Sequence, residues 1–236
     1  MTLPDSGARL VTPSIEPVLK SVFAPLGVLR AAINLGNPIL AQREPDTGQP
    51  KGVSIDLARE LARRLDVPLE LIAFEKAAQS VGAVRDEAAD VGFFAIDPAR
   101  SAGLLFTAAY VVIEGSHLVR IDSPIADNEA VDREGIRVAV ASGSAYDLHL
   151  TRELANASVE RFRLPAEVLA ALRDRRVDVA AGIRTMLAEW QRAEPGLRLL
   201  PGRFMLIQQA MGLPVSRGDA ARLHLAAFVE EMKASG

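Results

Sequence analysis

The chain has 236 residues, of which 49% are hydrophobic and 24% charged, and its formal net charge is −3. This length and composition indicate a globular protein with either one large domain or two small ones. The slightly acidic charge and an aromatic content of only 5% argue against nucleic acid as a partner, and the absence of cysteine excludes disulfides, thiol catalysis and zinc–thiolate sites.

Strands and helices are expected to alternate along the first half of the chain. Apolar residues at four-residue steps, Val53, Leu57, Leu61 and Leu65, predict a helix with one buried face. The other predicted elements are a short helix over 17–23, strands over 28–34, 69–74 and 90–96, and a helix over 76–87. Residues 37–51 are polar and rich in proline and glycine, which predicts a turn region. This alternation predicts βαβ units around a mainly parallel sheet.

A second βαβ series is expected after a long β-branched run over 110–120, which predicts a first crossing between two lobes. The series consists of strands beginning at 136, 159 and 177 and helices over 145–154, 166–173 and 185–193. An apolar run over 204–213 predicts the return crossing, and a last helix is expected over 219–233. The predicted domains are therefore an N-terminal extension with a short helix (1–27), a first lobe (28–119 and 210–236) and a second lobe (120–209).

One arginine lies just past the end of a buried strand. The run from Val91 to Ile96 ends in the turn Asp97-Pro98-Ala99-Arg100, and open α/β sheets bind their ligands at the carboxyl ends of strands. The guanidinium of Arg100 can hold a carboxylate through two parallel hydrogen bonds. Alternatively, Arg100 caps a neighbouring helix or pairs with a surface acid.

The loop Ser142-Gly143-Ser144-Ala145 lies between a predicted strand and a predicted helix. Free backbone N–H groups at the start of that helix, together with the Ser144 hydroxyl, favour an anion. The alternative is an ordinary helix N-cap at Ser142 or Ser144.

These motifs, in this order and spacing, resemble the family-3 extracellular solute-binding proteins, the amino-acid receptors of ABC importers. The resemblance rests on Leu29–Asn34, Gly48–Leu65, the turn at 97–100 and Gly135–Ala145, and it extends from about Val28 to the C-terminus. It implies a periplasmic-binding-protein-like α/β fold, with two lobes, each a mainly parallel sheet flanked by helices. A two-strand hinge would join the lobes, and a small ligand would be clamped between them.

The resemblance implies that Arg100 holds a ligand carboxylate, with Ala95 beside it and Gly143, Ser144 and Ala145 facing it from the second lobe. Where the family has a threonine, this chain has Asp97, which could pair with Arg100, cap the turn or accept a hydrogen bond from a ligand ammonium.

Two further features depart from the family pattern. The acid that usually meets the ligand ammonium in the second lobe is missing near Ile183, and Asp97 or Glu114 could replace it. The first loop carries Asn34 and Asn37 instead of aromatic residues, which predicts a polar cleft. We also expect Gln209, one of two glutamines in an apolar run, to face the cleft.

The predicted function is a binding protein that closes on a small carboxylate, an amino acid or a relative of one, for ABC-type uptake. We expect no catalytic residue, no metal and no cofactor. Its partners would be the ligand and an ABC permease, without membrane insertion, and the protein would be a monomer.

Two alternatives stay open. One is an enzyme similar to the cyclohexadienyl dehydratases, with Glu114 as its general acid, and the other is an orphan cytoplasmic sensor. The resemblance implies a periplasmic protein, but the first thirty residues lack a signal-peptide pattern, so Met1 as the natural start would indicate a cytoplasmic one.

Overall fold

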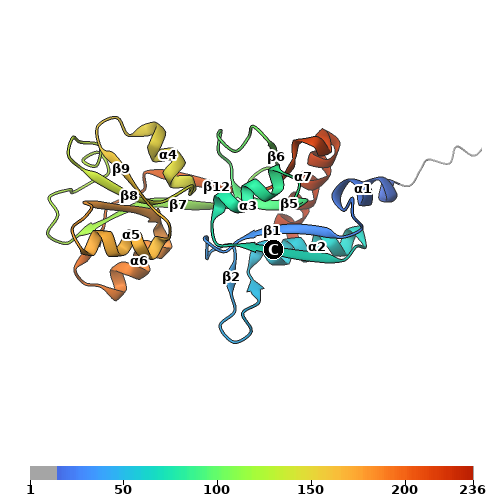
Figure 1. Ribbon diagram of the computed structural model, residues 1–236, viewed down its shortest axis with the longest axis horizontal. Helices are drawn as coiled ribbons and strands as arrows, with labels where there is room; N and C mark the ends of the chain where they lie inside the picture. Colours follow the sequence, from blue (N-terminus) through green and yellow to red (C-terminus); the bar gives the residue numbers. More distant parts are fainter. Residues whose placement is uncertain (1–14, 236) are drawn as a thin grey trace, which may run out of the picture.

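Two α/β lobes joined by two long strands make up the computed structural model, which describes residues 15–235 (Figure 1). The predicted fold class is confirmed. Most of the predicted N-terminal extension lies outside the described residues, and its short helix is α1 (Ile15–Phe23). The predicted lobe limits stay a prediction.

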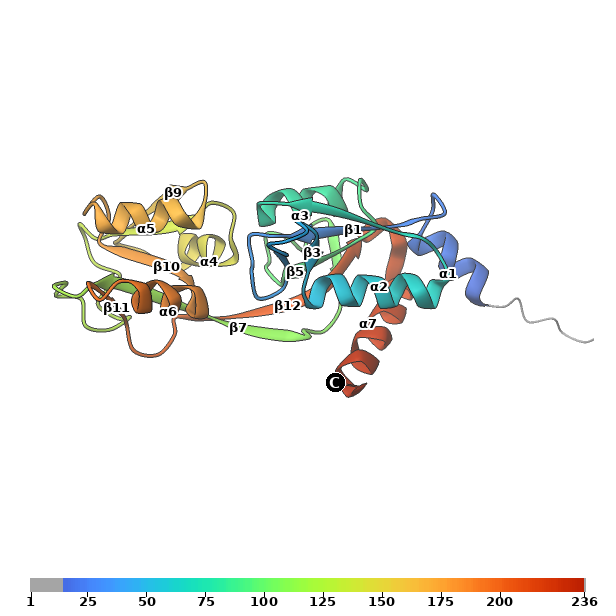
Figure 2. The ribbon, with the colours of Figure 1, turned by 90° about the horizontal axis from the view of Figure 1, so that it is seen from below.

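The first lobe contains a parallel sheet in the order β4-β1-β5, extended by antiparallel pairing of β12 with β5 and of β6 with β12. Its strands are β1 (Leu29–Asn34), β4 (Leu69–Phe74), β5 (Val91–Ala95) and β6 (Leu104–Phe106). Its helices are α2 (Val53–Leu65), α3 (Ala77–Arg85) and α7 (Gly218–Ser235), with a 3-10 turn at Val215–Arg217. The last helix of the chain therefore belongs to the first lobe (Figure 2).

The second lobe repeats this arrangement with parallel pairing of β8 with both β9 and β10. Its strands are β8 (Arg137–Ala141), β9 (Ser158–Phe162), β10 (Val179–Ile183) and the short β11 (Leu197–Leu199). Its helices are α4 (Ala145–Glu153), α5 (Pro165–Arg173) and α6 (Arg184–Ala193).

The hinge consists of β7 (Val111–Arg120) and β12 (Met205–Pro214), which run between the lobes in opposite directions (Figures 1 and 2). They pair with each other between Val111–Gly115 and Met205–Gln209. Beyond this segment β7 pairs with β10 and β12 pairs with β5, so one continuous sheet passes through both lobes.

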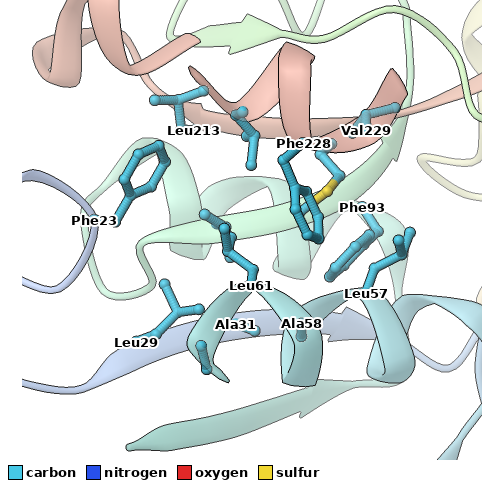
Figure 3. Packing of buried hydrophobic residues seen from close by; sticks show 14 of the residues in the cluster. Phe23, Leu29, Ala31, Leu57, Ala58, Leu61, Phe93, Leu213, Phe228 and Val229 are labelled. Carbon is cyan, nitrogen blue, oxygen red and sulfur yellow. The ribbon is translucent and has the colours of Figure 1, made fainter. Parts of the chain in front are cut away.

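The core of the first lobe lies between α2, α7 and the sheet (Figure 3). The four-residue spacing predicted for α2 buries Leu57, Leu61 and Leu65 against this core. Phe93 of β5 and Phe228 of α7 fill the space between them, each almost fully buried. Burying one such side chain contributes about 1.5–3 kcal/mol, so α7 is an integral part of the lobe.

The same ion pair braces the first and third strands in each lobe. The backbone amide and the guanidinium of Arg30 donate three hydrogen bonds to the Asp90 carboxylate, with donor–acceptor distances of 2.8–3.0 Å. Arg137 makes the same three hydrogen bonds to Asp178, each at 3.0 Å. In each lobe the aspartate directly precedes the third strand, and its backbone amide donates a hydrogen bond to the carbonyl of the arginine.

Differences from the predicted elements are local. Strand β10 begins at Val179 instead of 177 because Asp178 is engaged with Arg137. Two short strands, β2 (Gln42–Arg43) and β3 (Pro50–Lys51), form a hairpin inside the predicted turn region. The three-residue strands β6 and β11 were not predicted, because runs this short carry no periodicity.

Candidate functional site

A cavity lies between the two lobes, and its volume is about 640 Å³ when the space at its opening to solvent is included. Its walls come from the carboxyl ends of strands in both lobes, where an open α/β sheet binds its ligand. From the first lobe and the hinge, the polar lining residues are Asn34, Asn37, Glu75, Lys76, Arg100 and Gln209. From the second lobe they are Ser142, Ser144, Tyr146 and Arg163.

Arg100 is the central charged group of the cavity. Its side chain reaches across the lobes, donating to the Ala95 carbonyl at 3.2 Å and to the Gly143 carbonyl at 3.1 Å. Only 7% of the residue is exposed, and no carboxylate of residues 15–235 forms an ion pair with it. Burial lowers the pKa of the guanidinium, which the nearby Asp97 carboxylate partly opposes. A buried cation without a counter-ion is costly, so this environment favours an anionic ligand.

Asp97 does not line the cavity. Its carboxylate accepts from the Ala99 amide at 2.8 Å and from Arg152 of α4 at 2.9 and 3.3 Å. The Asp97–Arg152 ion pair therefore links the first lobe to the second. Both oxygens of Asp97 bond to Arg152, and no hydrogen bond joins Asp97 to Arg100 among residues 15–235.

The loop before α4 combines the two alternatives left open by the sequence. The Ser144 hydroxyl accepts from the Asp147 amide, as an N-cap does, and Ser144 and Ala145 also line the cavity. Gly143 is not among the lining residues, and its amide donates to the Asp147 side chain at 2.8 Å. Among the described residues, the amides of Ala145 and Tyr146 have no acceptor and stay free for a ligand.

Gly143 also approaches the first lobe closely. Its φ of +73° favours glycine, and a Cβ there would lie 3.0 Å from the Cβ of Ala78 in the first lobe. Gly143 and Arg152 of the second lobe thus both contact the first lobe.

Glu114 lies on β7, away from the cavity lining. Its half-exposed carboxylate pairs with Arg203 at 3.0 Å and with Arg184 at 3.5 Å. Gln209 is buried and lines the cavity, whereas Gln208 is exposed on the opposite face of β12.

The first-loop amides, Asn34 and Asn37, line the cavity together with Ala95. Their side-chain oxygens accept from the Gly36 amide at 3.0 Å and the Ile39 amide at 3.3 Å, respectively, which fixes the loop. The ligand-binding roles of all the predicted site residues stay predictions.

Sequence reasoning missed three charged lining residues, Glu75, Lys76 and Arg163. Each lies within two residues of a strand end, Glu75 and Lys76 after β4 and Arg163 after β9. The rule that pointed to Arg100 would have found them, had it been applied to every strand. Ile183, at the end of β10, also lines the cavity, so an apolar side chain stands where the family pattern has an acid.

The sequence matches the family described as bacterial extracellular solute-binding proteins, family 3, over residues 29–236. The chain belongs to this family. The resemblance inferred from the sequence is thereby confirmed, and the chain is a solute-binding protein whose family serves uptake. None of the curated proteins searched matches it.

Solved structures of amino-acid-binding proteins share the fold. An L-arginine-bound AbpA from Streptococcus pneumoniae superposes with a TM-score of 0.76 at 18% identity, covering 92% of this chain and 93% of that one. Holo ArgBP from T. maritima gives 0.73 at 21% identity, covering 88% and 91%. At these identities the likeness shows the fold alone.

A third neighbour bears on the enzyme alternative. It is an ancestral amino acid-binding protein described as a precursor of cyclohexadienyl dehydratase, with a TM-score of 0.73, 21% identity and coverage of 92% and 94%. Glu114, the acid predicted for such an enzyme, does not line the cavity. Within residues 15–235, no helix has the length and apolar character needed to cross a membrane.

Proposed function

We propose that this protein binds a small carboxylate, an amino acid or a relative of one, between its lobes and delivers it to an ABC-type permease outside the cytoplasm. The observation that carries the proposal is Arg100, a buried guanidinium in the interlobe cavity that has no carboxylate partner among residues 15–235. A ligand carboxylate would supply the missing negative charge. The arginine bound to its structural neighbour AbpA is one carboxylate of this kind.

Closure would follow from contacts in both lobes. Arg100 and the free amides at the start of α4 line the same cavity from opposite lobes, so a carboxylate between them would contact both lobes at once. A ligand that binds the closed form better than the open form shifts the equilibrium toward closure. The permease would then recognise the closed form.

Titration calorimetry on protein unfolded and refolded to remove bound ligand tests the proposal, with amino acids and small carboxylates as the panel. We expect selective binding that weakens at least about hundredfold in Arg100→Met, because a buried charge pair loses one partner. Arg192→Met, on the exposed surface of α6, is the matched control. Equal affinity in Arg100→Met, or no binding by any panel member, would refute the proposal.

A further inference from the structure

The cavity holds more positive charge than one carboxylate neutralises. Three cationic side chains line it, Arg100, Lys76 and Arg163, and Glu75 is the only carboxylate among its lining residues. Glu75 is exposed and already paired with Arg43 at 3.1 Å. The lining therefore carries an excess of two positive charges.

Lys76 supplies a second cation that has no partner. It is half-buried, it immediately precedes α3, and its ammonium forms no ion pair or hydrogen bond with the described residues. The other lysines that the structure describes, Lys20, Lys51 and Lys233, each pair with a carboxylate. Lys76 is thus the one described lysine without a carboxylate partner. In the same way, Arg100 differs from the other buried charged side chains that the structure describes, each of which forms an ion pair. Arg163 is exposed and pairs at 3.5 Å with Glu167.

The backbone adds to this positive potential. Helices α3 and α4 both begin at the cavity, from opposite lobes, and the first amides of each, at Ala77 and Ala145, have no acceptor among residues 15–235. Helix N-termini carry partial positive charge. No carboxylate of the second lobe lines the cavity to offset it, and Ile183 there is apolar.

Resting on the proposed function, we propose that the ligand is a short dicarboxylate, with one carboxylate on Arg100 and the free amides of α4 and the second on Lys76. A second negative charge would neutralise the excess that a monocarboxylate leaves. A cationic amino acid, such as the arginine bound to AbpA, would instead add positive charge to a cavity that already carries it. Acidic amino acids and dicarboxylic acids without an ammonium share the required chemistry.

Calorimetry with matched C5 ligands tests this: glutamate and glutarate carry two carboxylates, whereas glutamine carries one. Arginine, with six carbons, is the cationic comparison. A parallel C4 set uses aspartate, succinate and asparagine. We expect a dicarboxylate to bind at least about tenfold more tightly than glutamine, asparagine and arginine, because one extra charge pair is worth about that factor. Comparing glutamate with glutarate, and aspartate with succinate, shows whether the preferred dicarboxylate carries an ammonium group.

Lys76→Met is expected to weaken dicarboxylate binding about tenfold and to leave any glutamine or asparagine binding within about twofold. Lys233→Met, on the outer helix α7, is the control and is expected to change neither. Tighter binding of arginine, glutamine or asparagine, lost in Arg100→Met, would overturn this inference and leave the proposed function standing. An unchanged dicarboxylate affinity in Lys76→Met would overturn the inference as well. Binding by no carboxylate at all would overturn both.

Discussion

The two lobes use the same strand brace in different surroundings. Asp90 in the first lobe is buried, with 1% of its side chain exposed, and a third group, Arg217, lies 3.3 Å from it. Asp178 in the second lobe pairs with Arg137 alone among the described residues, and 27% of its side chain is exposed. The same three hydrogen bonds therefore contribute unequally to the stability of the two lobes. Losing one partner of an ion pair costs more when the remaining charge is buried away from water.

The largest expected effect comes from breaking the two braces separately. Asp90→Asn leaves the guanidinium of Arg30 facing a neutral group, while Arg217 keeps Glu87 as its partner, and should lower the free energy of unfolding by about 3–5 kcal/mol. Asp178→Asn should cost only about 1–2 kcal/mol, since water can solvate Arg137. Urea denaturation of both variants checks this. Equal losses would show that burial does not distinguish the lobes.

Acid should destabilise the second lobe through His117. This side chain is 2% exposed, stacks on Phe204 and bonds to Asn128 at 2.9 Å, and burial lowers its pKa to about 4. Between pH 6.5 and 4 the unfolded chain takes up a proton that the folded one does not, so stability falls as the pH falls. The loss should approach about 3 kcal/mol at pH 4.

His117→Leu tests this assignment. Urea denaturation at pH 6.5 and 4.5 should give a smaller difference in unfolding free energy for this variant than for the wild type. The unpaired Asn128 affects both pH values alike and cancels. His224→Leu, on the exposed face of α7 in the first lobe, is the control. If His117→Leu loses as much unfolding free energy between pH 6.5 and 4.5 as the wild type does, the acid sensitivity arises from other groups.

The smallest expected effect concerns the ion pair that joins the lobes. Arg152→Met leaves Asp97 buried without its cation in the closed form, which favours opening. Ligand dissociation constants should rise about threefold to tenfold, with Arg192→Met as the control. X-ray scattering of the ligand-free variant should show a larger radius of gyration. A compact ligand-free variant with unchanged affinity would mean that the pair does not contribute to closure.

Most of the fold could be predicted because its signals are local. The four-residue apolar spacing of α2 and the β-branched run of β7 gave elements within a residue or two of those observed. The repeated brace was not predicted, since Arg30 and Asp90 are sixty residues apart and their pairing depends on strand order. The β2–β3 hairpin was missed for a different reason, because its two-residue strands are too short to show a pattern.

The site could be predicted only in part. Arg100 and Ser144 follow strand ends, and the topology brings both to the cavity. Asp97 and Glu114 were weighed as partners for a ligand ammonium, and this role stays a prediction; the pairing of their carboxylates with Arg152 and Arg203 was not foreseen. The pairing of arginines with acids depends on distances between elements that are remote in sequence. The spacing of residues along the chain does not determine these distances.

The position of α7 has a consequence for how the chain is synthesised. Its residues Leu225, Phe228 and Val229 complete the core of the lobe that begins with β1. Domains generally fold as units as they leave the ribosome. The lobe made first must therefore wait for the final eighteen-residue helix, whereas the lobe made second has all of its strands and helices by Met205. Ribosome-bound chains that lack α7 would carry a finished second lobe joined to an open, unfinished first one.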